Sequence, residues 1–174
     1  VKNSLKNKNR IIISGMGTAY YAGLVIKNYI EALSKIPVVT EAASEFHNRK
    51  QIFYKSDLFI CISQSGETAD TLSALRDAKS KGILSISIVN VVGSTIARES
   101  DAGIYQHIGP EVGVASTKAF TSQVVLGALI AILLGVEHKS LDKSEAKLIL
   151  SEIKKIPLKI GNLLKNSEKV KDIA

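Results

Sequence analysis

The sequence has no tryptophan, one cysteine and only three prolines, and aromatic residues make up only 5% of its 174 positions. A core with so few aromatic side chains is aliphatic, as in a buried parallel sheet. The one cysteine, Cys61, lies in an apolar stretch, so a disulfide framework is excluded and a reducing compartment is expected. Because 45% of the residues are hydrophobic, the chain is predicted to form one domain with a substantial core.

Long hydrophobic runs are also lacking. The longest, residues 124–136, is shorter than the roughly 20 residues that cross a bilayer, so we expect a buried helix there and no membrane span. The first ten residues are polar and give no indication of a signal peptide. The one methionine is Met16, so we expect the chain to be a segment of a longer protein. We expect that protein to be cytoplasmic.

The positive charge is confined to the ends of the chain. Of the net charge of +7, residues 1–10 carry four basic and no acidic side chains, and residues 139–174 carry nine lysines against five acidic residues. The central part is therefore close to neutral. A nucleic-acid-binding domain needs a basic stripe across its working face, so we expect no nucleic-acid partner.

The pattern of apolar and polar residues predicts alternating strands and helices. Short apolar runs predict strands at residues 11–14, 38–40, 57–62, 84–89 and 103–107. Helical spacing predicts helices at 19–34, 68–81 and 116–134, with helical turns at 43–47 and 95–99. Strands linked by crossover helices predict an α/β fold: a three-layer αβα sandwich around a five-stranded parallel sheet.

The chain is expected to form a single domain in three parts. Residues 1–9 are a polar lead-in, residues 10–137 the α/β core and residues 138–174 a C-terminal helical extension. Pro157 is expected to break or restart the helix of the extension. An apolar face of this extension is expected to pack on the core or on a neighbouring subunit.

The most informative stretch is the polar turn at residues 63–68, Ser-Gln-Ser-Gly-Glu-Thr. It separates a predicted buried strand from a predicted helix, so hydroxyls, an amide and unpaired helical N–H groups meet at one place. Such a turn is either a plain helix cap or an anion site. A second polar turn, residues 15–18, also follows a strand, and both lie where ligands bind in parallel sheets. Ser116 is expected to cap the long apolar helix, either as a plain N-cap or as a third wall of the same pocket.

Two segments partly resemble nucleotide-binding motifs but do not match them. The run from Gly15 to Tyr20 lacks the third glycine of a dinucleotide fingerprint. Residues 114–118 resemble the end of a phosphate-binding loop, but the upstream Gly-x-x-x-x-Gly-Lys spacing is absent. Neither NAD nor a nucleoside triphosphate is therefore expected.

Four motifs, in order, resemble the sugar isomerase (SIS) family: Gly17-Thr18, Ala-Ala-Ser-Glu-Phe at 42–46, Ser-Gln-Ser-Gly-Glu-Thr-Ala-Asp-Thr at 63–71, and Gly-Val-Ala-Ser-Thr-Lys-Ala-Phe at 113–120. The resemblance covers about residues 10–174. It is closer still to the first half of the isomerase region of the glutamine–fructose-6-phosphate aminotransferase family. It implies a flavodoxin-like SIS fold and a pocket for fructose 6-phosphate or glucosamine 6-phosphate.

The resemblance also implies which residues contact the ligand. The matching positions are Thr18, Ser63, Gln64, Ser65, Thr68 and Ser116, with Gly17, Ala19, Gly66 and Val114 as further candidates. Ala19 stands where the family often has serine. Because a carboxylate repels a phosphate, Glu67 is expected to point away from the ligand, and one possible direction is toward a partner chain.

The same resemblance places catalysis elsewhere in the parent enzyme. In the family, the acid–base residues lie in a second SIS half, and a glutaminase domain supplies ammonia, so this chain is expected to bind sugar phosphate without turning it over. No catalytic residue, cofactor or metal is therefore expected, and His47, His107 and His138 are expected to be structural or surface residues. A homodimer is expected. Two alternatives remain: an SIS sensor module of a regulator, and a dimerisation scaffold with a degenerate pocket.

Overall fold

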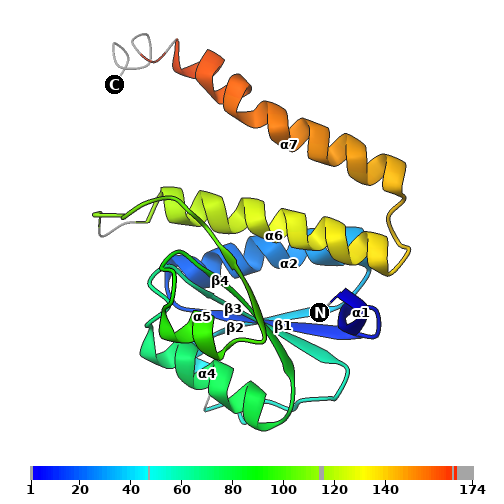
Figure 1. The fold of residues 1–174 in the computed structure, drawn as a ribbon, viewed down its shortest axis with the longest axis vertical. Coiled ribbons are helices and arrows are strands. Elements are labelled where there is room, and N and C mark those ends of the chain that lie inside the picture. The colour runs from blue at the N-terminus through cyan, green and yellow to red at the C-terminus, as the bar shows by residue number, and fades with distance from the viewer. Residues whose placement is uncertain (1, 47, 114–115, 166, 168–174) are drawn as a thin grey trace.

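The computed structural model describes residues 2–46, 48–113, 116–165 and 167. Its centre is a parallel sheet with the strand order β2-β1-β3-β4-β5 (Figure 1). The strands are β1 (Arg10–Gly15), β2 (Val38–Ala42), β3 (Asp57–Ser63), β4 (Leu84–Val89) and β5 (Ala102–Tyr105). This order is the flavodoxin-like one, so the predicted sheet is confirmed.

Helices cover both faces of the sheet. The helices are α1 (Lys2–Leu5), α2 (Thr18–Ser34), α3 (Ala43–Phe46), α4 (Ala69–Ser80), α5 (Thr95–Glu99), α6 (Lys118–Glu137) and α7 (Lys143–Leu164). Figure 1 shows α2 and α6 on one face and α4 and α5 on the other. The predicted three-layer αβα sandwich is therefore confirmed.

Alternate strand residues build two hydrophobic layers. On one face, Ile13 of β1 packs with Ile26 of α2 and Ile130 of α6. On the other face, Ile12 of β1 packs with Leu75 of α4. Both faces of the central strand β1 are thus buried, as in the parallel sheets of α/β proteins.

Helix α6 packs closely against α2. Gly127 is the point of contact, since an added Cβ there would lie 2.2 Å from Cγ1 of Ile26. By length and hydropathy alone α6 would suffice to cross a membrane, but 44% of its most apolar window is buried within the described residues. Its place against α2 is that of a core helix, as predicted from the apolar run.

The C-terminal extension corrects one prediction. Pro157 does not break the helix, because α7 runs unbroken through it. Proline removes one backbone hydrogen bond, to the carbonyl four residues earlier, and around Pro157 the helix is exposed, so water can replace that bond. The helix therefore continues past the proline.

Only the first half of α7 packs on the body of the protein. Ala146 and Ile149 contact a small cluster that includes Ile132 of α6. Beyond this cluster α7 diverges from the body (Figure 1), and large apolar side chains are exposed along it. They are Ile156, Leu158, Ile160, Leu163 and Leu164, and Leu148 is also exposed, on the outer side of the packed turns. The predicted contact of the extension with the core thus holds for its first turns.

Strand β4 and helix α5 have the predicted bounds, and the other predicted elements differ by one to three residues at their ends. The largest difference is at the end of α6, which extends to Glu137. This helix begins at Lys118 with Thr117 at the N-cap position, so the prediction that Ser116 caps it is wrong. Strand β5 ends at Tyr105 and not at His107, whose φ of 53° does not fit an extended strand.

Candidate functional site

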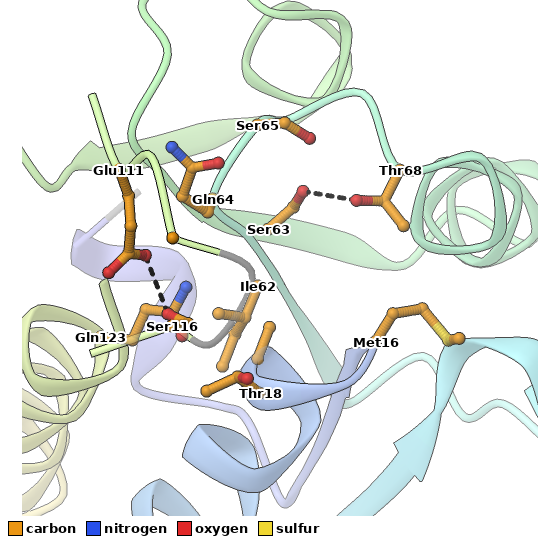
Figure 2. A pocket seen from close by; sticks show the side chains of 12 residues that line it. Met16, Thr18, Ile62, Ser63, Gln64, Ser65, Thr68, Glu111, Ser116 and Gln123 are labelled. Atoms are coloured by element: carbon orange, nitrogen blue, oxygen red, sulfur yellow. Dashed lines mark hydrogen bonds between the residues drawn. The ribbon is translucent and has the colours of Figure 1, made fainter. Parts of the chain in front are cut away.

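A cavity of about 250 Å³ opens at the carboxyl edge of β1 and β3. These neighbouring strands are followed by α2 and α4, which lie on opposite faces of the sheet, so the cavity lies at a topological switch point. Three chain segments supply its walls (Figure 2). The lining residues are Met16, Thr18, Ala19, Ile62, Ser63, Gln64, Ser65, Thr68, Glu111, Gly113, Ser116 and Gln123.

The loop between β3 and α4 forms one wall and is closed by its own hydroxyls. Oγ of Ser63 lies 3.0 Å from Oγ1 of Thr68, and it accepts the backbone N–H of Gly66 at 3.0 Å. Oγ of Ser65 accepts the backbone N–H of Glu67 at 3.2 Å. These bonds hold the hydroxyls of Ser63, Ser65 and Thr68 at one side of the cavity.

Gly66 is required at the centre of this loop for two reasons. Its φ of +68° lies in the left-handed region that favours glycine. An added Cβ would also lie 2.0 Å from Oγ of Ser94, which is buried in the loop after β4. The close approach of these two loops leaves no room for a side chain.

Backbone and side-chain bonds join the same two loops. The carbonyl of Gln64 accepts the N–H of Asn90 at 3.0 Å, and the carbonyl of Gly66 accepts that of Ile96 at 3.0 Å. Oε1 of Glu67 accepts the N–H of Thr95 at 2.7 Å, which lowers the pKa of this exposed carboxyl below its usual value. Glu67 thus points away from the cavity, as predicted, but toward α5 of its own chain.

Two helices start at the cavity without a side-chain cap. Thr68 is at the N-cap position of α4 and Gly17 at that of α2, and neither makes a side-chain capping bond. The hydroxyl of Thr68 instead bonds Ser63. Because the first N–H groups of a helix lack intrahelical partners and carry partial positive charge, both ends favour an anion.

The N-terminus of α6, in contrast, is already occupied by a carboxylate. Oε1 of Glu111 accepts the backbone N–H groups of Thr117 at 2.9 Å and Lys118 at 3.1 Å. Oε2 of Glu111 accepts the hydroxyl of Ser116 at 2.9 Å. The capping role that the sequence predicted for Ser116 is therefore taken by Glu111.

These bonds determine the charge of the second wall of the cavity, which is formed at the start of α6 by Glu111 and Ser116. The N–H of Thr117 is the chief cause that lowers the pKa of Glu111, so this carboxyl is ionised at neutral pH. No lysine or arginine is among the described residues that line the cavity. The cavity therefore has an anion-favouring wall at α2 and α4 and an anionic wall at the start of α6.

A buried amide completes the second wall. Gln123, one turn into α6, is 2% exposed, and its Oε1 has no hydrogen-bond partner among the described residues. Figure 2 shows Gln123, Ser116 and Glu111 together on one side of the cavity, across from Ser65 and Thr68. The Gln123 amide, the Ser116 hydroxyl and the hydroxyls of Ser65 and Thr68 thus surround the same cavity.

The structure brings together all six principal residues of the sequence prediction. Thr18, Ser63, Gln64, Ser65, Thr68 and Ser116 line the cavity, as does the further candidate Ala19. Gly17 and Gly66 do not line it but shape its turns, and Val114 falls outside the described residues.

Sequence reasoning missed Met16, Ile62, Glu111, Gly113 and Gln123. The sequence does contain a signal for Gln123. Gln123 is an uncharged polar residue on the face of α6 that otherwise buries Gly127, Ile130 and Leu134. A buried amide on an apolar helix face needs a hydrogen-bond partner, and this could have identified it.

Other polar and reactive groups lie away from the cavity. Burial raises the pKa of the Cys61 thiol to about 12, which leaves it protonated and unreactive. Nε2 of His138 lies 3.0 Å from the carbonyl of Leu5. Among the described residues no group of three or more metal-binding side chains gathers. The prediction for His47 falls outside the described residues.

Comparison with known proteins gives a consistent result. The sequence profile of the SIS domain matches residues 4–133. The chain is 48% identical over 170 residues to the isomerising glutamine–fructose-6-phosphate aminotransferase of Chlorobaculum tepidum, covering 98% of this chain and 28% of that enzyme. The second human enzyme of this name is 39% identical over 170 residues, with 98% and 25% covered.

One solved structure is similar over nearly the whole chain. It is the C-terminal domain of glucosamine-fructose-6-phosphate aminotransferase from Francisella tularensis, with a TM-score of 0.93 and 38% identity, covering 99% of this chain and 49% of that one. The chain thus spans about half of that domain and about a quarter of the full-length relatives. By the match to residues 4–133 and by its fold, the chain belongs to the SIS domain family.

Proposed function

We propose that this chain is the sugar-phosphate-binding half of the isomerase region of a glutamine–fructose-6-phosphate aminotransferase. The observation that carries the proposal is the cavity at the switch point, where three hydroxyls surround a helix N-terminus without a side-chain cap. Neutral donors and a helix dipole bind a phosphate dianion and still release it. The names and identities of the relatives support the same assignment.

The two walls orient the ligand in the proposed complex. The phosphate lies at the start of α4, among Ser63, Ser65 and Thr68, where the N-cap residue makes no side-chain capping bond. It avoids the start of α6, because the Glu111 carboxylate already fills that site and repels a second anion. The sugar carbons then extend toward Ser116 and Gln123.

In the parent enzyme this half would hold fructose 6-phosphate while ammonia from glutamine is added and glucosamine 6-phosphate is formed. The residues of this chain bind and orient the sugar phosphate. The acid–base residues of the reaction belong, by the family resemblance, to the second half, and the glutaminase domain to another part. The chain alone is therefore proposed to bind substrate or product without turnover, and to work in the cytoplasm.

Calorimetric titration of the 174-residue chain tests this proposal. Fructose 6-phosphate and glucosamine 6-phosphate are expected to bind saturably, and inorganic phosphate more weakly. Unphosphorylated glucosamine is expected not to bind, because it lacks the group that the α4 terminus recognises. A folded sample that binds neither sugar phosphate contradicts the proposal and favours the scaffold alternative.

The proposal includes a homodimer. Its support is an apolar groove of about 350 Å³ between α2, α6 and α7, lined by residues such as Tyr29, Val125 and Ile153, together with the exposed apolar residues along α7. Sedimentation equilibrium of the chain is expected to give twice the mass of 18.7 kDa. The variant Leu163→Glu, which puts a charge on the exposed α7 surface, is expected to shift the equilibrium toward monomer.

A further inference from the structure

We infer that the side-chain amide of Gln123 is a specificity-determining contact, which accepts a hydrogen bond from a hydroxyl of the sugar through Oε1. This inference rests on the proposed function and adds a residue to its sugar end. Its starting observation is an acceptor at the cavity wall that has no partner within the described part of the chain.

The position of Gln123 makes this amide costly without a ligand. It lies on the same face of α6 as Gly127, Ile130 and Leu134, all buried against the body of the protein. An apolar side chain would fit this face without burying a polar atom, whereas a buried acceptor without a partner destabilises a protein. A ligand hydroxyl that bonds Oε1 removes this cost in the bound state.

Location decides that the missing partner is a ligand. Gln106, at the end of β5, is also buried, 8% exposed, and both its amide atoms lack partners among the described residues. Gln106 is not among the residues that line the cavity, whereas Gln123 is. Of these two glutamines, Gln123 is therefore the one within reach of a molecule bound in the cavity.

The hydrogen bonds at the start of α6 indicate which chemical group of the ligand Gln123 binds. Glu111 and Ser116 are already paired with each other, whereas Oε1 of Gln123 beside them has no hydrogen-bond partner among the described residues. An acceptor bonds a hydroxyl or an ammonium group and not a phosphate oxygen. Gln123 therefore discriminates between phosphorylated sugars and phosphate alone, and contributes nothing to phosphate affinity.

The test compares Gln123→Leu with the matched variant Gln106→Leu in the 174-residue chain. Each replaces a buried amide whose oxygen lacks a partner among the described residues by an apolar side chain of similar size, and thermal unfolding checks that both fold. Calorimetry with fructose 6-phosphate and with inorganic phosphate is the measurement. Should Gln123→Leu fail to fold, Gln123→Met serves in its place, because its flexible side chain adapts to the same space.

The expected result is an affinity of Gln123→Leu for fructose 6-phosphate that is about tenfold lower, with phosphate affinity unchanged within about twofold. Gln106→Leu is expected to bind both ligands like the unmodified chain. Unchanged sugar-phosphate affinity in Gln123→Leu overturns the inference and leaves the proposed function standing. An equal loss for both ligands also overturns it, and failure of the unmodified chain to bind fructose 6-phosphate overturns the proposed function and this inference together.

Discussion

The hydroxyl oxygens of Ser63 and Thr68 lie 3.0 Å apart and close the loop that leads from β3 into α4. Because the Thr68 hydroxyl is turned to Ser63, it does not cap α4, and the first N–H groups of that helix remain available to a ligand. The bond thus links the shape of the loop to the anion-binding capacity that we propose for it.

Replacing Thr68 by valine keeps the shape of the side chain and removes this hydroxyl. We expect the free energy of sugar-phosphate binding to become less favourable by about 1–3 kcal/mol, the usual contribution of a hydrogen bond to a charged group. Calorimetric titration with fructose 6-phosphate is the measurement, and Ser65→Ala is expected to give a similar loss. The control is Thr121→Val on the exposed side of α6, which is expected to change nothing. If Thr68→Val and Ser65→Ala both bind like the unmodified chain, the turn is a plain cap and the phosphate site lies elsewhere.

Gly66→Ala is expected to destabilise the protein beyond the cost of its backbone conformation. Gly109 has a similar φ of +70° but no atom within 4 Å of an added Cβ, so Gly109→Ala isolates that backbone cost, about 1–2 kcal/mol. At Gly66 the added Cβ also meets Ser94, and the free energy of unfolding in urea is expected to fall by a further 1–3 kcal/mol, roughly the cost of overpacking. Equal losses in the two variants would show that the loops around Gly66 can separate at little cost.

The start of α6 is expected to depend on pH through Glu111. Its pKa is lowered in the folded protein, chiefly by the N–H of Thr117, so its contribution to stability is complete above the unfolded value near 4.5. The contribution is lost as the pH falls through the lower folded value. The amide resonance of Thr117 in NMR is expected to titrate with a midpoint below 4.5, and Glu111→Gln is expected to remove this transition. A midpoint at or above 4.5 contradicts the capping role.

The contact between α2 and α6 predicts a coupled pair of substitutions. Gly127→Ala places a Cβ against Ile26 and is expected to lower the free energy of unfolding by about 1–3 kcal/mol. In a background of Ile26→Ala the space is vacant, so the same change is expected to cost less. Denaturation of the two single variants and the double variant measures the coupling, and strict additivity would show that the helices shift apart instead.

The sheet and the first two walls of the cavity were predictable because their signals are local. A buried apolar run followed by Ser63, Ser65 and Thr68 defines a strand end and a helix start within a few residues. The position of Gly17 and Thr18 after another strand follows from the same rule, since parallel strands end at one edge of the sheet. The family resemblance then supplied the list of positions that the structure brings together.

The wall at the start of α6 was less predictable because its bonds depend on the path of a loop. The sequence places Ser116 just before an apolar helix, where serine is an ordinary cap. Only the fold shows that Glu111, five residues earlier, returns to occupy the helix terminus and to hold the Ser116 hydroxyl. Likewise, the direction of Gln123 depends on how α6 is rotated against α2, which is fixed by the contact at Gly127.

The error at Pro157 has a similar origin. A proline inside a helix is unfavourable, but its cost is limited when solvent satisfies the carbonyl that loses its bond. The exposure of α7 around Pro157 follows from how far the helix extends beyond the cluster at Ala146, and the local sequence does not show this.

The central claim is a phosphate-dependent sugar site at the start of α4, and one titration tests it most directly. Fructose 6-phosphate is added to the unmodified chain and to Thr68→Val in the same calorimetric experiment, with inorganic phosphate as the second ligand. Saturable binding to the unmodified chain, with weaker binding of both ligands by the variant, is the predicted result. Fructose 6-phosphate that binds both proteins equally well, or neither folded protein at all, would contradict the claim.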